Sequence, residues 1–136
     1  MTYSEIEREM YILGGKIHVP KKYYPSIQFG DSYESTFIEI SDNAYYLIFM
    51  ERGQELERKK FLHVDDLLFE IFKYITSNMA IWYEANHRIV GRDFRRTMFA
   101  YQLELMGKLK SEWQCKLQQE IESILDRHPY KDALGL

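Results

Sequence analysis

The spacing of hydrophobic residues changes twice along the chain, from helical to alternating and back to helical. From about Ser4 to Ile17, apolar residues recur at steps of three and four, which predicts one buried face of a helix. The apolar positions of this stripe are Ile6, Met10, Leu13 and Ile17. Ser4 and Glu7 have the spacing of a capping box, so we expect the helix to begin there.

Alternating patterns in the middle of the chain predict a small antiparallel β-meander of three to four strands. The expected strands cover residues 35–41, 44–52 and 55–61, and a shorter candidate covers residues 26–30. The run that begins at Ala44 is almost continuously apolar, so we expect it to be central and covered on both faces. The run that ends at Phe61 is rich in Lys and Arg, which suits an edge strand.

Helical spacing returns at Asp65 and predicts three C-terminal helices. The first should end near Ile89, the second should run from about Asp93 to Gly107, and the third should begin at Ser111 and end at "HPY". Their expected core positions are Leu68, Ile71, Phe72, Ile75, Met79 and Trp82, then Phe94, Met98, Tyr101 and Leu105, and finally Trp113, Leu117, Ile121 and Ile124. Helices segregated from an antiparallel sheet define an α+β fold, and the length of the chain suits a single domain over residues 1–136.

Charge and cysteine content narrow the function classes. The formal net charge of −3 argues against general binding of nucleic acid, which depends on a basic excess. No stretch is long and apolar enough to predict a membrane span or the core of a signal peptide. Cys115 is the only cysteine, so no internal disulfide can form, and we expect a cytoplasmic protein.

The most unusual segment is "HRIVGRDFRRTMF", residues 87–99, because it concentrates arginines. We expect it to form a structural ion-pair cluster with nearby acceptors, since a guanidinium beside a core buries its stem and finds partners. The expected members are Glu51, Glu84, Arg88, Arg92, Arg95 and Arg96, with the helix carbonyls near Ile89 as further acceptors. A docking site for a protein is the second interpretation, and an RNA-binding patch is the third.

No catalytic, cofactor-binding or metal-ligating set is predicted. Glu84 and His87 have the Glu-x-x-His spacing of di-metal helical bundles, but such sites need two of these motifs and the chain has one. An ion pair between Glu84 and Arg88, four residues apart, explains the acid more simply. The serines lie at expected caps and turns, and Gly14-Gly15 lacks the spacing of a phosphate-binding loop.

Taken together, several segments resemble the immunity protein 63 family of bacterial polymorphic-toxin systems. The resemblance is carried by "ERGQELERK", "DDLLFEIF", the stretch from Met79 to Leu109, and the closing "ILDRHPY". It implies a non-catalytic cytoplasmic protein that binds and neutralises a cognate toxin. An adaptor module without a toxin partner and, further behind, a metal-dependent enzyme are the alternatives.

An inhibitor of this kind needs a surface complementary to its target. Tyrosines in loops are candidate interface anchors, and acids beside them would attract a basic toxin cleft. The candidate partner-binding residues are Tyr23, Tyr24, Asp31, Tyr33 and Glu34.

Overall fold

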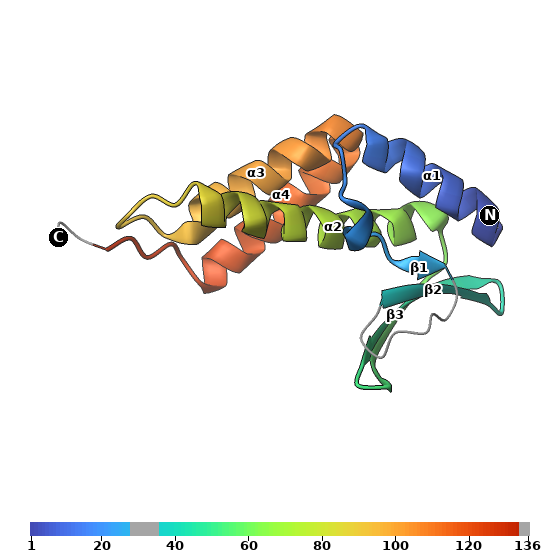
Figure 1. Ribbon diagram of the computed structural model, residues 1–136. Coiled ribbons are helices and arrows are strands. Elements are labelled where there is room, and N and C mark those ends of the chain that lie inside the picture. Colours follow the sequence, from blue (N-terminus) through green and yellow to red (C-terminus); the bar gives the residue numbers. More distant parts are fainter. Residues whose placement is uncertain (28–35, 134–136) are drawn as a thin grey trace. The chain divides into compact units, whose positions relative to one another are not determined.

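The computed structural model describes residues 1–27 and 36–133, and it has the predicted α+β fold (Figure 1). An N-terminal helix precedes a four-stranded sheet, and three helices follow the sheet. The elements are α1 (Tyr3–Gly15), the 3-10 turn η1 (Lys21–Tyr23), β1 (Ser26–Ile27), β2 (Thr36–Ser41), β3 (Ala44–Glu51), β4 (Gln54–Phe61), α2 (Val64–Asn86), α3 (Phe94–Leu109) and α4 (Ser111–Arg127).

The chain divides into two compact units, Met1–Phe72 and Lys73–Leu136. The first unit holds α1, the sheet and the start of α2, and the second holds the rest of α2 with α3 and α4. That residues 1–136 act as one domain stays a prediction.

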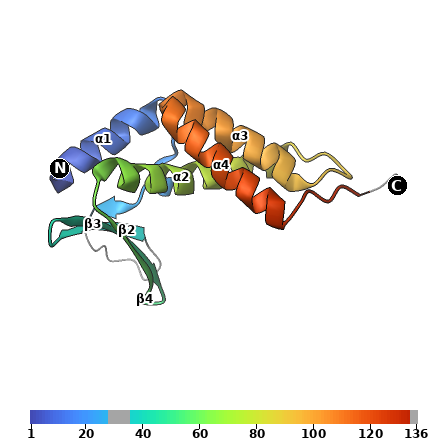
Figure 2. The ribbon, with the colours of Figure 1, turned by 180° about the vertical axis from the view of Figure 1, so that it is seen from behind.

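The sheet has the strand order β1-β2-β3-β4, with β3 in its interior and β4 at one edge (Figure 2). Two-residue turns join β2 to β3 and β3 to β4, with positive φ at Asp42, Asn43, Arg52 and Gly53. Such turns match the twist of paired strands, and Asn, Asp and Gly tolerate the left-handed conformation best. Strand β4 is almost entirely exposed, as its polar sequence predicted. In β3, by contrast, Ala44, Leu47 and Ile48 are buried while the intervening residues remain partly exposed.

The pairing of β1 differs from the predicted meander, because β1 runs parallel to β2. Ser26 lies opposite Phe37, and Ile27 opposite Ile38. A parallel pair cannot be closed by a tight turn and needs a longer connection. Alternation of side chains along a strand does not encode the direction of its partner, so the sequence pattern could not distinguish the two arrangements.

Helix α1 buries the predicted stripe, with Ile6, Met10 and Leu13 in the core. Its capping box is formed by Thr2 and Glu5, two residues before the predicted pair. The Thr2 hydroxyl accepts from the Glu5 amide, and the Glu5 carboxylate accepts from the Thr2 amide. The hydroxyl of Tyr3 accepts a hydrogen bond from the Ile40 amide at 2.8 Å, which fastens the start of α1 to β2.

In the second unit, the buried face of α3 differs from the predicted stripe. Its buried residues are Phe99, Gln102, Leu105, Met106 and Leu109. Gln102 is 5% exposed, and its amide donates to the Lys73 carbonyl at 3.0 Å and to the Thr76 hydroxyl at 3.2 Å. A buried amide with satisfied hydrogen bonds replaces an apolar residue at this point, so a search for apolar periodicity places the core face wrongly.

The junction of α3 and α4 also departs from the prediction. Gly107 lies inside α3, which continues to Leu109, and the side chain of Gln114 packs where a Cβ of Gly107 would lie. Helix α4 begins at Ser111, as predicted, and Lys110 occupies the N-cap position without a side-chain hydrogen bond. The side-chain amide of Gln114 donates to the Leu103 carbonyl at 3.1 Å and so joins the two helices.

Candidate functional site

The candidate site lies where α2 ends and α3 begins, and side chains determine where α2 stops. The Asn86 amide donates to the Trp82 carbonyl at 2.8 Å, and Nδ1 of His87 bonds the Tyr83 carbonyl at 2.8 Å. These contacts satisfy carbonyls that have no partner at a helix C-terminus. The helix therefore ends at Asn86, three residues before the predicted end at Ile89.

Three aromatic rings lie in a stack beside this end of α2. The Tyr83 ring lies 4.0 Å from the His87 ring and 4.0 Å from the Tyr101 ring, centroid to centroid, with interplanar angles of 16° and 4°. Tyr101 belongs to α3, so the stack joins the last turn of α2 to α3. The His87 side chain is therefore held by the ring and the carbonyl of Tyr83. No group of side chains that could hold a metal ion occurs among residues 1–27 and 36–133.

Glu84 is the buried acid of the site. Its carboxylate accepts from Arg88 Nε at 3.1 Å and from Nη2 at 2.7 Å, a two-point ion pair at i, i+4. The Arg88 guanidinium holds the pKa of Glu84 below its ordinary value, although desolvation acts in the opposite direction. The Arg88 side chain nevertheless stays 65% exposed, so part of its guanidinium still faces water.

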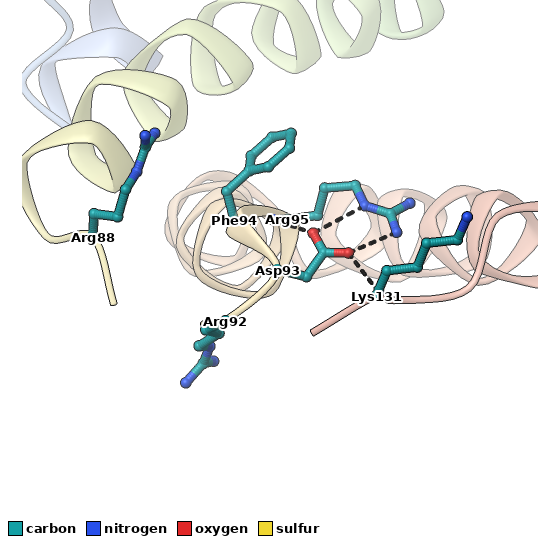
Figure 3. Close-up of a pocket in the computed structure, with 6 residues that line it drawn as sticks. All are labelled: Arg88, Arg92, Asp93, Phe94, Arg95 and Lys131. Atoms are coloured by element: carbon teal, nitrogen blue, oxygen red, sulfur yellow. Dashed lines mark hydrogen bonds and ion pairs between the residues drawn. The ribbon is translucent and has the colours of Figure 1, made fainter. Parts of the chain in front are cut away.

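Asp93 is the centre of the site and caps α3 (Figure 3). One carboxylate oxygen accepts from the backbone and side chain of Arg95, and the other accepts from Arg95 Nη2 at 2.9 Å and the Lys131 amide at 2.8 Å. The hydrogen-bonded ion pair with Arg95 is the main reason why the pKa of Asp93 lies far below its ordinary value. The hydrogen bonds from the Lys131 and Arg95 amides lower it further. With both oxygens occupied, this carboxylate is a poor general base.

Arg95 also ties the C-terminal segment to α3. Its guanidinium donates to the carbonyls of His128 and Pro129 at 2.8 and 2.9 Å, and it lies 5.4 Å from the Tyr130 ring centroid. Carbonyl partners for an arginine were expected near Ile89, and the structure supplies them after α4 instead.

Arg96, the next residue of α3, also ties the C-terminal segment to this helix. It pairs with Asp132 at 2.9 Å and lies 4.2 Å from the Tyr130 ring centroid. The Asp132 carboxylate also accepts from the Asp93 amide at 2.7 Å, and the Ala133 amide donates to the Gly91 carbonyl at 2.8 Å. Residues 131–133 are therefore fastened to the start of α3 and to the linker between α2 and α3.

An open pocket of about 390 Å³ lies in this region. It is lined by Arg88, Arg92, Asp93, Phe94, Arg95 and Lys131 (Figure 3). Within the described part of the chain, neither the Arg92 guanidinium nor the Lys131 ammonium has an ion-pair partner. Because Arg95 already neutralises Asp93, the pocket keeps an excess of positive charge and is suited to an anionic group.

The other expected site residues lie elsewhere in the chain. Glu51 is exposed at the end of β3, opposite Gln54 of β4. Tyr23 is half-buried, with the Lys22 ammonium 5.3 Å from its ring centroid. Tyr24 packs edge-on against Tyr11, with ring centroids 4.8 Å apart, and burial raises the pKa of its hydroxyl. The remaining candidates, Asp31, Tyr33 and Glu34, lie outside the described residues.

Sequence reasoning missed several residues of this site. Asp93, Tyr130 and Asp132 were not assigned to the cluster, although an acid directly before a helix is a typical N-cap. Trp82 and Phe94 were assigned to the core, and the structure leaves them 61% and 52% exposed. Both residues continue the apolar spacing of their helices, but they lie beyond the apolar residues of each helix that are buried.

The comparisons with known proteins agree with the resemblance drawn from the sequence. The family described as Immunity protein 63 matches residues 41–123, which include β3, β4, α2, α3 and most of α4. No curated protein and no solved structure matches the chain. Among the described residues, no helix has the length and apolar character needed to cross a membrane. Because the match covers more than half of the sequence, the chain belongs to the Immunity protein 63 family.

Proposed function

We propose that the chain is an immunity protein that acts in the bacterial cytoplasm by binding a cognate toxin and blocking it, without catalysis of its own. Membership of the Immunity protein 63 family is the observation that carries the proposal. A toxin-neutralising protein needs a stable scaffold and a complementary surface, and it needs no reactive group.

The chemistry of the candidate site supports a binding role. Its acids are engaged in hydrogen bonds and ion pairs that hold the backbone in place, with Asp93 ionised and bonded through both oxygens. The arginines of such a site would contact another protein through hydrogen bonds and charge. The loop residues Tyr23, Tyr24, Asp31, Tyr33 and Glu34 remain a candidate partner-binding set within this proposal.

The direct test uses the protein encoded beside the gene of this chain. That protein is expressed in bacteria under an inducible promoter, with and without this chain. We expect growth arrest in its absence, protection in its presence, and a complex of the two purified proteins. Arrest that this chain does not relieve, with no complex detected, would contradict the proposal.

The alternative of an adaptor module makes a different prediction. An adaptor would bind a partner that is not toxic, so the neighbouring protein would leave growth unaffected when expressed alone. A stoichiometric metal in the purified protein, lost on His87→Ala, would instead support a metal-dependent activity.

A further inference from the structure

Two features occur together around the linker between α2 and α3. We define the linker surface as the pocket residues Arg88, Arg92, Phe94 and Lys131 together with the exposed apolar residues Ile81, Trp82, Ile89 and Val90. All of these residues lie in the second compact unit.

The first feature is positive charge that has no ion-pair partner among residues 1–27 and 36–133. Glu84, Asp93 and Asp132 are each paired with one arginine. These pairings leave Arg92 and Lys131 without an ion pair in the described part of the chain, and they leave Arg88 largely exposed. The linker surface is therefore locally basic, although the whole chain has a net charge of −3.

The second feature is a concentration of exposed apolar side chains. Single exposed apolar residues are normal on protein surfaces, whereas several that gather into one patch mark an interaction site. Trp82 is 61% exposed, Val90 is 94% exposed, and Ile81, Ile89 and Phe94 are each 52% exposed. Tryptophan and arginine are also the side chains that most often dominate the energy of an interface.

The backbone beneath these side chains is already held in place. The Gly91 carbonyl accepts from the Ala133 amide, the Asp93 amide donates to Asp132, and Asp93 caps α3. Because these bonds order the linker before binding, a partner would lose less conformational entropy in docking there.

From these observations we infer that the linker surface is the docking site for the toxin, and that the toxin presents an acidic segment with apolar residues beside its carboxylates. This inference rests on the proposed immunity function. Carboxylates of the toxin would meet Arg88, Arg92 and Lys131, and its apolar side chains would cover Val90, Phe94 and Trp82. Charge complementarity selects such a segment, since a fork of guanidinium donors matches a carboxylate.

A protein partner fits better than a nucleic acid. A phosphate backbone carries charge along its whole length and is repelled by an acidic protein. The chain has a sequence pI near 5.8, so the basic character is confined to one small region. A short acidic segment of a protein matches a region of that size.

The test measures binding of the purified neighbouring toxin, in a catalytically inactive form, by calorimetry at two salt concentrations. Arg92→Glu and Trp82→Ala should each weaken binding by about tenfold or more, as expected for interface anchors. Arg92→Glu should also reduce the salt dependence, because it removes a charge attraction. Melting curves establish that each variant is folded, and Arg92→Glu alters an exposed side chain that has no ion pair with any described residue.

Two exposed residues of the first unit provide matched controls. Lys60→Glu makes the same change of charge on β4, and Ile12→Ser removes an apolar side chain that is 55% exposed on α1. Both should bind within about twofold of the wild type, which is typical of residues outside an interface.

The outcomes separate this inference from the function on which it rests. Wild-type binding that survives both linker variants would overturn the docking site and leave the immunity function standing. Absence of any wild-type complex would overturn both. Binding of an RNA oligonucleotide that Arg92→Glu abolishes, with toxin binding unchanged, would show that the linker surface has a different partner.

Discussion

Asp93 and Arg95 form an ion pair with Oδ2 and Nη2 2.9 Å apart, and their side chains are 7% and 19% exposed. Arg95 also donates to the carbonyls of His128 and Pro129, and Asp93 also accepts from the Lys131 amide. Through these contacts, two residues at the start of α3 hold the segment that follows α4. The pair therefore fixes the backbone next to the linker surface, and both residues line its pocket.

Removal of Arg95 should destabilise the protein, because the Asp93 carboxylate and two backbone carbonyls lose donors. We expect Arg95→Met to lower the melting temperature clearly. Arg92→Met is the matched control, since Arg92 is exposed and has no ion pair in the described residues. Equal melting temperatures for the two variants would contradict a structural role of Arg95.

Stability should fall at acid pH, and Asp93 should contribute to the loss. The pKa of Asp93 is lower in the folded protein than its ordinary value of 3.8. The unfolded state therefore binds a proton first, so the contribution is fully present above about pH 4 and declines as the pH falls below that value. Asp132 and Glu84 have lowered pKa values for the same kind of reason, an arginine partner, and act in the same direction.

Urea titrations between pH 2 and pH 7 measure this effect. Asp93→Asn should make the free energy of unfolding less dependent on pH at the acid end, whereas Asp126→Asn, an exposed acid on α4, should follow the wild type. An unchanged pH dependence in Asp93→Asn would show that the Arg95 pair is weak in solution.

Gln102 should stabilise the protein, because its buried side-chain amide donates hydrogen bonds to two acceptors. Gln102→Ala should lower the free energy of unfolding by about 1–3 kcal/mol, since the Lys73 carbonyl and Thr76 hydroxyl lose a buried donor. Gln118→Ala, on the exposed side of α4, should change it by less than about 0.5 kcal/mol. Chemical denaturation of both variants tests the difference.

Gly91 has a φ of +82°, a left-handed conformation that costs a residue with a Cβ about 1–2 kcal/mol. Gly91→Ala should therefore destabilise the protein and weaken the hydrogen bond between its carbonyl and the Ala133 amide. Gly15→Ala, at the last residue of α1 with open space around it, should instead stabilise by up to about 1 kcal/mol. Thermal melts that move in the same direction for both variants would contradict this account.

Regular hydrophobic periodicity predicted much of the fold. The steps of Ile6, Met10 and Leu13 predicted the buried face of α1, and the alternating runs predicted β2, β3 and β4. These signals are local, since each depends on the conformational preference of a few neighbouring residues.

The missed features depend on partners distant in sequence. Gln102 is buried only because Lys73 and Thr76 offer acceptors, and Asp132 is ordered only because Arg96 and the Asp93 amide lie beside it. Trp82 continues an apolar stripe, but nothing in the stripe indicates where the packed face ends. The candidate site was therefore predicted as an arginine cluster, while most of its acceptors and its exposed apolar residues were not.

The central claim is that this chain neutralises a toxin by binding it, and a titration of toxin activity tests that claim most directly. A fixed amount of the active neighbouring toxin is mixed with increasing amounts of the purified chain, and residual activity is measured after short and long incubation. The account predicts that inhibition rises in proportion to the added chain, reaches completion at a fixed molar ratio, and does not grow with time. Complete inactivation by a small molar fraction of the chain, progressing with time, would show a catalytic action and contradict the account.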